Sequence, residues 1–172
     1  MDTTEWDSLI DQKISRVLYL DEFDEPGYYD QNLSVHFIEY GSIALELASG
    51  LRFLIENNYE RQGLSLIPYQ GPAPEPKCEI SLHKDPIWSA TQNQAVQEVI
   101  CYPGHYFVER KPGKQEKVTI TGTIELCFEH GARVFISNAG LDEEGRLTSD
   151  LFVKAIYQNR KIGVEAGLIP EV

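Results

Sequence analysis

The sequence lacks the usual marks of a membrane or exported protein. It has no apolar run near the ~20 residues that a membrane span requires. Its start, Met1-Asp-Thr-Thr-Glu, lacks the basic residues and apolar core of a signal peptide. We therefore expect a cytoplasmic protein.

Cysteine and histidine are too few and too scattered to predict a metal site. The three cysteines form no CxxC pair, which favours reduced thiols over a disulfide framework or a zinc site. They are Cys78, Cys101 and Cys127. The four histidines form no HxH or HxxxH pair. They are His36, His83, His105 and His130. We therefore expect no metal and no other cofactor.

Catalytic motifs are also missing. There is no GxxxxGK[ST] phosphate loop, no GxGxxG nucleotide fingerprint and no nucleophile elbow. The acidic segment 141–146 lacks the alternating oxygen ligands and distal glutamate of an EF-hand. We therefore expect a protein without enzymatic activity. If it were an enzyme, carboxylates near His36 or His130 would be the first place to look.

The composition is that of a compact protein with a strong acidic bias. Of the 172 residues, 42% are hydrophobic and 10% aromatic, enough for a substantial core. The net charge is -12, and residues 1–82 hold 15 acids against 5 bases, whereas residues 83–172 hold 12 against 10. An acidic surface repels nucleic acid and anionic membranes, so a basic protein is the favoured partner.

The segment 41–57 is repeated at 122–138. Seven of the 17 paired positions are identical, where ordinary residue usage would give roughly one. The identical pairs are Gly41/Gly122, Ile43/Ile124, Leu45/Leu126, Gly50/Gly131, Arg52/Arg133, Ile55/Ile136 and Asn57/Asn138. Upstream matches are Trp6/Trp88, Gln12/Gln94 and Val17/Val99. We predict one compact domain, residues 1–172, made of two repeats at about 1–82 and 83–172.

Alternating apolar residues predict that each repeated segment is a β-hairpin. In the first copy, Leu45 should face Phe53 and Ile43 should face Ile55 across a three-residue loop. Gly50 ends this loop and should have positive φ, which only glycine adopts without steric cost.

The second copy predicts the same register with different side chains. Its facing pairs are Phe128/Ala132, Leu126/Val134 and Ile124/Ile136, and its turn glycine is Gly131. On the opposite face of the two hairpins, Glu46 should lie across from Arg52, and Glu125 should lie diagonal to Arg133. These carboxylates account for the repeated arginine without an anion site.

The predicted fold class is α+β with mainly antiparallel strands, each repeat contributing a short tryptophan-led helical turn, strands and a hairpin. The expected helix covers residues 6–16. Further strands are expected at 16–20, 33–40, 64–69, 104–110, 118–128 and 151–156. Residues 110–117 are expected to form a basic turn, and the chain from 163 onward a loosely packed tail.

Residues 21–30 combine five acids with three aromatic residues. One interpretation is a solvated loop. The other is an interaction loop, in which charge attracts a partner and aromatic side chains anchor it. The candidate binding residues are Asp21, Glu22, Phe23, Asp24, Glu25, Tyr28, Tyr29 and Asp30.

Two segments resemble the immunity proteins that bacteria pair with toxins. They are Trp6-x-x-Leu-Ile-Asp-Gln-Lys-Ile and Gly41-x-Ile-x-Leu-x-x-x-x-Gly, in a small, acidic, β-rich chain. The resemblance implies a bacterial protein that binds a basic toxin domain, often a nuclease, and blocks its active site. We expect a monomer or weak dimer. The alternatives are a small-molecule or carbohydrate-binding module with a cleft between the repeats, and a structural self-association domain.

Overall fold

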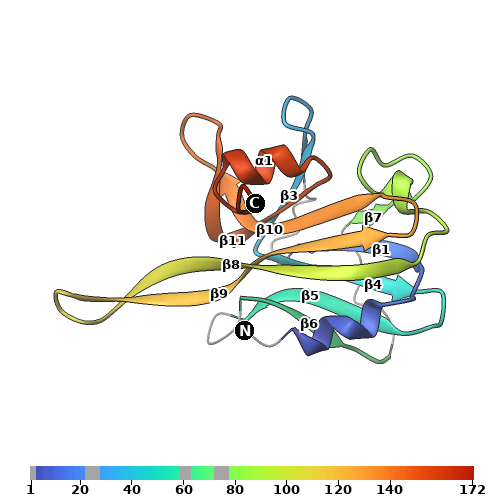
Figure 1. Ribbon diagram of the computed structural model, residues 1–172, viewed down its shortest axis with the longest axis horizontal. Helices are drawn as coiled ribbons and strands as arrows, with labels where there is room; N and C mark the ends of the chain where they lie inside the picture. The colour runs from blue at the N-terminus through green and yellow to red at the C-terminus, as the bar shows by residue number, and fades with distance from the viewer. Residues whose placement is uncertain (1–2, 22–27, 59–62, 72–77) are drawn as a thin grey trace.

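The computed structural model describes residues 3–21, 28–58, 63–71 and 78–172. This part of the chain forms one sheet of 11 strands that curls into a half-barrel (Figure 1). Its helical structure consists of two 3-10 turns and one short α-helix. The predicted α+β class is therefore wrong, and the fold is essentially all-β. None of the described helices is long and apolar enough to cross a membrane.

The elements follow in chain order. They are η1 (Thr4–Leu9), β1 (Ile14–Asp21), β2 (Tyr28–Asp30), β3 (Val35–Glu39), β4 (Gly41–Leu47), β5 (Arg52–Asn58), β6 (Gly63–Pro68), β7 (Cys78–Ile80), η2 (Trp88–Thr91), β8 (Val96–Lys111), β9 (Lys114–Phe128), β10 (Arg133–Leu141), β11 (Leu147–Tyr157) and α1 (Arg160–Glu165).

The helix predicted over residues 6–16 is only the 3-10 turn η1. The backbone becomes extended at Ile10, which ends the 3-10 turn. Asp11 has positive φ, and its N–H donates to the carbonyl of Val96. Ile14 then points into the core from β1 instead of from a helix face. The apolar spacing that favoured a helix is therefore satisfied by a turn followed by a strand.

The sheet order is β2-β3-β11-β10-β9-β6-β5-β4-β1-β7, with β8 paired to β9 beside this path. The first half of the chain supplies β6-β5-β4-β1, and the second half supplies β11-β10-β9-β8. These two groups meet where Gly63 pairs with Thr121. A Cβ on Gly63 would lie 2.3 Å from the Thr121 carbonyl oxygen, so glycine permits this close approach.

Both predicted hairpin registers are confirmed. Leu45 pairs with Phe53 and Ile43 with Ile55 in the first hairpin. Leu126 pairs with Val134 and Ile124 with Ile136 in the second. Gly50 and Gly131 have φ of 91° and 85°, as expected for the last loop residue. The strand order is the same in both halves, and the duplication remains a prediction from the sequence.

The halves differ in the residues that precede each hairpin. In the first half, Tyr40 has positive φ and separates β3 from β4. Strand β3 then pairs with β11 of the second half. In the second half the corresponding residues continue without a break as the long strand β9. The strand predicted over residues 33–40 is therefore present as β3, but it pairs with β2 on one side and with β11 of the other half on the other side.

Strands β8 and β9 extend beyond the body as a two-stranded ribbon, the yellow projection at the left of Figure 1. We call the projecting residues 104–119 the arm. The remainder of the described chain is called the body.

The core has two parts. The larger cluster fills the half-barrel and includes Trp6 and Trp88, whose side chains are fully buried. The smaller cluster lies on the other face of β3, β11 and β10 and includes Phe135 and Tyr157, whose rings stack. Helix α1 and the residues after it cover this second cluster (Figure 1).

The C-terminal segment is not the loose tail that the sequence predicted. Asn159 accepts a hydrogen bond from the Lys161 amide and begins α1. Gly163 is packed so closely that an added Cβ would lie 2.5 Å from both the Tyr157 hydroxyl and the Ile169 side chain. Ile169 is buried in the second core cluster. The segment is fixed by apolar contacts whose partners lie on distant strands.

Candidate binding surfaces

The predicted acidic loop is only partly described. Asp21 ends β1, and Glu22, Phe23, Asp24 and Glu25 lie outside the described residues. Tyr28, Tyr29 and Asp30 form strand β2, which pairs with β3 at the edge of the sheet. These three residues are therefore in a strand, and the prediction of a continuous loop over 21–30 is wrong for them.

The two tyrosines of β2 have different environments. Tyr28 is 44% exposed, and its ring stacks on Phe37 with the centroids 5.1 Å apart. Tyr29 is half-buried and contacts His36 at 4.8 Å between centroids. Asp30 accepts a hydrogen bond of 2.9 Å from the Leu33 amide and so stabilises a turn. Tyr28 is the tyrosine of this pair that is available to a partner.

Tyr29 belongs to a buried polar cluster that joins β1, β3 and η2. His36 Nε2 lies 2.7 Å from Asp85 Oδ1, and Asp85 Oδ2 accepts the N–H groups of Ile87 and Trp88 at 2.9 Å. Burial alone would raise the pKa of Asp85, but the bonds from His36 and these two amides outweigh it, and the pKa is lowered. Trp88 Nε1 donates to the Tyr19 hydroxyl at 2.7 Å.

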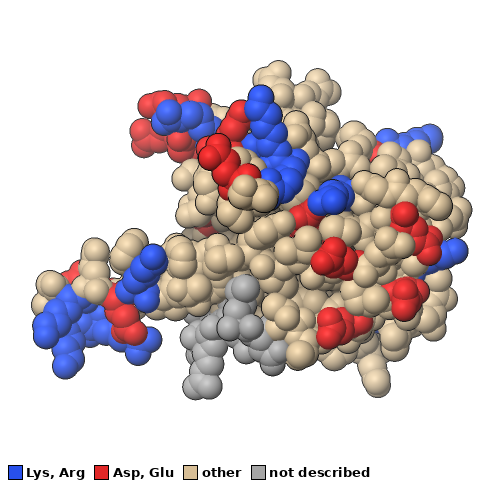
Figure 2. Space-filling model, viewed as in Figure 1, with Lys and Arg blue, Asp and Glu red and all other residues tan. Residues whose placement is uncertain are grey.

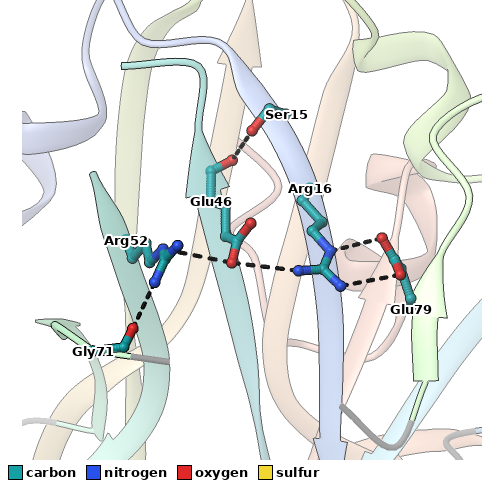
Figure 3. Close-up of polar contacts among 6 residues, drawn as sticks. All are labelled: Ser15, Arg16, Glu46, Arg52, Gly71 and Glu79. Carbon is teal, nitrogen blue, oxygen red and sulfur yellow. Dashed lines mark hydrogen bonds and ion pairs between the residues drawn. The ribbon is translucent and has the colours of Figure 1, made fainter. Parts of the chain in front are cut away.

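A network of charged side chains covers the outer face of the first half (Figure 3). Arg16 donates to both carboxylate oxygens of Glu79, at 2.7 and 3.2 Å. One oxygen of Glu46 lies 3.6 Å from a nitrogen of Arg16 and 3.6 Å from a nitrogen of Arg52. Arg52 also donates to the carbonyl of Gly71 at 2.6 Å. The predicted Glu46–Arg52 pair is confirmed, and carboxylates neutralise both arginines.

The second half has the predicted Glu125–Arg133 ion pair, in a more buried setting. Glu125 is fully buried and also accepts a hydrogen bond of 2.5 Å from the Tyr102 hydroxyl. The Arg133 side chain is 51% exposed. Neither repeated arginine therefore needs an external anion to balance its charge.

The arm carries most of its charge at its end. Four bases and two acids lie within residues 104–119, a net charge of +2, so the rest of the chain has a net charge of -14. The bases are Arg110, Lys111, Lys114 and Lys117. Figure 2 shows a blue cluster with a smaller red area at the tip of the projection, and both red and blue side chains scattered over the body. Charge is therefore separated between arm and body.

The arm is a two-stranded ribbon with a register shift between Glu109 and Lys111, closed by a tight turn at Pro112 and Gly113. Its strands stay paired as far as Lys111 and Lys114. Gly113 has positive φ, and its amide donates to Glu109 at 2.8 Å. Phe107 projects from the ribbon with 64% of its surface exposed. The sequence predicted a strand at 104–110 and a broad turn at 110–117, but the turn is narrower and the projection was missed.

A cavity of about 390 Å³ opens at the base of the arm. It is lined by residues of β8, β9, β10 and β11 and by residues 166–168, which follow α1. All of these residues belong to the second half of the chain. The cavity therefore does not lie between the two repeats, where the carbohydrate-binding alternative placed its cleft.

The cysteines and histidines lie apart in the described structure. All three cysteines are free and partly buried, and burial raises the pKa of Cys101 and Cys127 to about 11. Among the residues that the structure describes, no group of three or more His, Cys, Asp or Glu side chains could hold a metal ion.

Comparison of the chain with protein-family models, with curated proteins and with solved structures gives no match in any of the three.

Proposed function

We propose that this chain is a binding protein of the bacterial cytoplasm, without enzymatic activity, that attaches to a basic protein and covers its functional surface. The sequence resemblance suggests a toxin domain, such as a nuclease, as that partner. One molecule would bind one partner, and the free protein would be a monomer or weak dimer.

The separation of charge between arm and body is the observation that carries this proposal. Four bases are gathered on the arm, and the rest of the sequence has a net charge of -14. Such a field attracts a basic protein over several ångströms and raises the association rate, while it repels nucleic acid. The acidic half of the chain is also where the candidate loop residues lie.

The arm and the exposed aromatic rings supply contact area and anchoring side chains, which charge alone does not provide. A stable interface buries about 800 Å² on each partner, roughly a tenth of the surface of a small protein. A projecting ribbon enlarges the surface that a partner can contact. Phe107 and Tyr28 are exposed aromatic side chains, the type that anchors protein interfaces.

The direct test uses the basic protein encoded by the neighbouring reading frame in the native host. The two proteins would be purified separately, mixed and analysed by light scattering, and the partner's enzymatic activity would be titrated with this chain. We expect a one-to-one complex, loss of that activity at one equivalent, and association that slows about tenfold or more when salt is raised from low to high.

A complex that forms equally fast at high and low salt would remove the electrostatic basis of the proposal. A partner that stays fully active when saturated would exclude occlusion. A basic protein of unrelated fold and similar charge serves as the control for non-specific attraction.

A further inference from the structure

The cavity at the base of the arm contains a buried amide without a hydrogen-bond partner. Asn138 lines the cavity and is 4% exposed. Neither its side-chain oxygen nor its side-chain nitrogen has a partner among the described residues. An unpaired buried amide destabilises a protein, so such groups are normally paired with protein, water or ligand.

The repeat supplies a comparison within the same chain. Asn57 occupies the matching position in the first half, and its side-chain nitrogen donates to the carbonyl of Leu151. Asn57 therefore has a structural partner within the chain. The side-chain oxygen of Asn57 has no partner among the described residues either. Asn138 differs because it lines the cavity and because neither of its two polar atoms is paired.

A large irregularity in β11 shapes the cavity wall. Asn138 pairs with Lys154, but the next residue, Ala139, pairs with Ser149, so residues 150–153 are extra in β11. This bulge is held in place by several bonds. Asp150 accepts the Phe152 amide at 2.8 Å, and the Leu151 carbonyl accepts from the side chain of Asn57. Bulges of this kind often orient side chains beside binding sites.

The remaining lining limits the chemistry of a ligand. Asp150 offers only acceptor oxygens, Thr148 and Ser149 offer hydroxyl groups, and the cavity lining contains no Lys or Arg. An anion would be repelled by Asp150, and His105 is the one side chain of the described lining that can carry a positive charge. Ile120 and Leu168 add apolar surface to the same wall.

A polyhydroxylated, uncharged molecule matches all of these groups at once. Each hydroxyl both donates and accepts, so it satisfies the carbonyl and the amino group of Asn138, and it donates to Asp150. The C–H face of a sugar ring suits the apolar side chains. The volume also lies within the range of about 300–1,000 Å³ that small-molecule sites occupy. We propose that this cavity binds a mono- or disaccharide, with Asn138 and Asp150 as its principal polar contacts.

This proposal is independent of the protein partner proposed above. The test is a titration of the ¹⁵N-labelled full chain with glucose, galactose, N-acetylglucosamine, maltose and lactose at millimolar concentration. We expect at least one sugar to shift the side-chain amide signals of Asn138 together with the backbone amides of Gly104 and Gly167. Adenine and nicotinamide are included because they also present a donor beside an acceptor.

Two variants locate the binding chemistry. Asn138→Leu removes both amide atoms, and Asp150→Asn keeps the acceptor for the Phe152 amide while it replaces the second oxygen. Each should weaken sugar binding by about tenfold or more, the loss of roughly one good hydrogen bond. Gln115→Leu, the loss of an amide at the exposed arm tip, should leave the affinity unchanged. Circular dichroism would confirm that each variant is folded.

The outcomes separate the possibilities. If none of the compounds shifts the Asn138 signals, the cavity holds water only and the proposal is wrong. If only adenine or nicotinamide binds, the site recognises a planar amide edge and the assignment to sugars is wrong. Sugar binding that survives both substitutions would place the ligand elsewhere and also overturn the proposal.

Discussion

Gly104 and Gly122 face each other across β8 and β9 so closely that a Cβ on Gly122 would lie 2.7 Å from the Cα of Gly104. The contact lies where the arm leaves the body, beside a register shift in β8 at Tyr102 and Pro103. The absence of side chains on both glycines lets the two paired strands approach each other closely here.

We therefore expect Gly122→Ala to destabilise the protein by about 1–3 kcal/mol, because backbone atoms would have to move apart. Urea unfolding followed by tryptophan fluorescence would measure this. Gly113→Asn at the arm tip is the matched control, since asparagine tolerates positive φ and nothing lies near its Cβ. Equal stability of the two variants would mean that the close approach of Gly104 and Gly122 leaves room for a methyl group.

The hydrogen bond between Trp88 and Tyr19 predicts energetic coupling. Both side chains are buried, so Trp88→Ala should cost about 3–5 kcal/mol through the cavity that it leaves. The bond itself is tested by a double-mutant cycle with Trp88→Phe and Tyr19→Phe. We expect a coupling energy of about 1 kcal/mol, the usual net value of a buried hydrogen bond. Strict additivity would show that the bond adds no stability.

Lys154 predicts a specific dependence of stability on pH. Burial lowers its pKa to about 8, against an opposing effect of Glu56, and its ammonium donates to the Gly41 carbonyl. Because the folded-state pKa lies below the unfolded value of 10.5, the unfolded chain binds more protons between these two values. The free energy of unfolding attributable to this group is therefore lowest at neutral pH and rises as pH increases through 8.

Lys154→Met should remove this dependence and stabilise the protein at neutral pH by on the order of 1–3 kcal/mol. The measurement is urea unfolding of both proteins from about pH 7 to about pH 9. The raised pKa values of Cys101 and Cys127 act in the opposite direction above this range, so the difference between the two proteins isolates the lysine. A difference that does not change with pH would contradict the prediction.

The two tyrosines of β2 predict different effects on a protein complex. Tyr28→Ala should speed dissociation, by ~1–2 kcal/mol or more if the ring is an anchor. It should cost less stability than Tyr29→Ala, because the Tyr28 ring stacks on Phe37 but is the more exposed of the two. Tyr29→Ala should instead lower stability, because its ring packs against His36. Surface binding kinetics and thermal melts would separate the two effects.

Replacement of Asp21, Glu22, Asp24 and Glu25 by serine is the complementary test of the acidic segment. It should slow association with the basic partner and flatten its salt dependence, because charges at a rim mainly affect the encounter rate. Unchanged association at low salt would return this segment to the role of a solvated loop. The charged face around Glu46 would then be the next surface to test.

The hairpins could be predicted because their information is local. Alternating side chains and one glycine fix which residues face each other, so the pairing of Leu45 with Phe53 follows from a few neighbouring positions. The fold class could not be predicted in the same way. The apolar spacing from Trp6 to Ile14 fits a helix as well as a 3-10 turn that leads into a strand.

The sites depended on contacts that sequence patterns do not specify. The sequence of residues 104–119 predicts strands and a turn. It does not show that these strands project from the body as a two-stranded ribbon. Asn57 and Asn138 are identical residues in a repeat, yet the side-chain nitrogen of Asn57 has a partner whereas Asn138 lines a cavity and has none among the described residues. The bulge in β11 creates this difference, and an irregular register leaves no periodic signal.

The pairing of β3 with β11 also determines when the fold can be completed. Ile38 and Lys154 are neighbours in the sheet although most of the chain separates them, so β3 has only the three-residue strand β2 as a partner until β11 has been synthesised. Long-range pairing of this kind slows folding, because the entropy of closing a large loop is lost before the contact forms. The first half is therefore expected to remain an incomplete, aggregation-prone sheet during synthesis, and a chaperone would act on it at that stage.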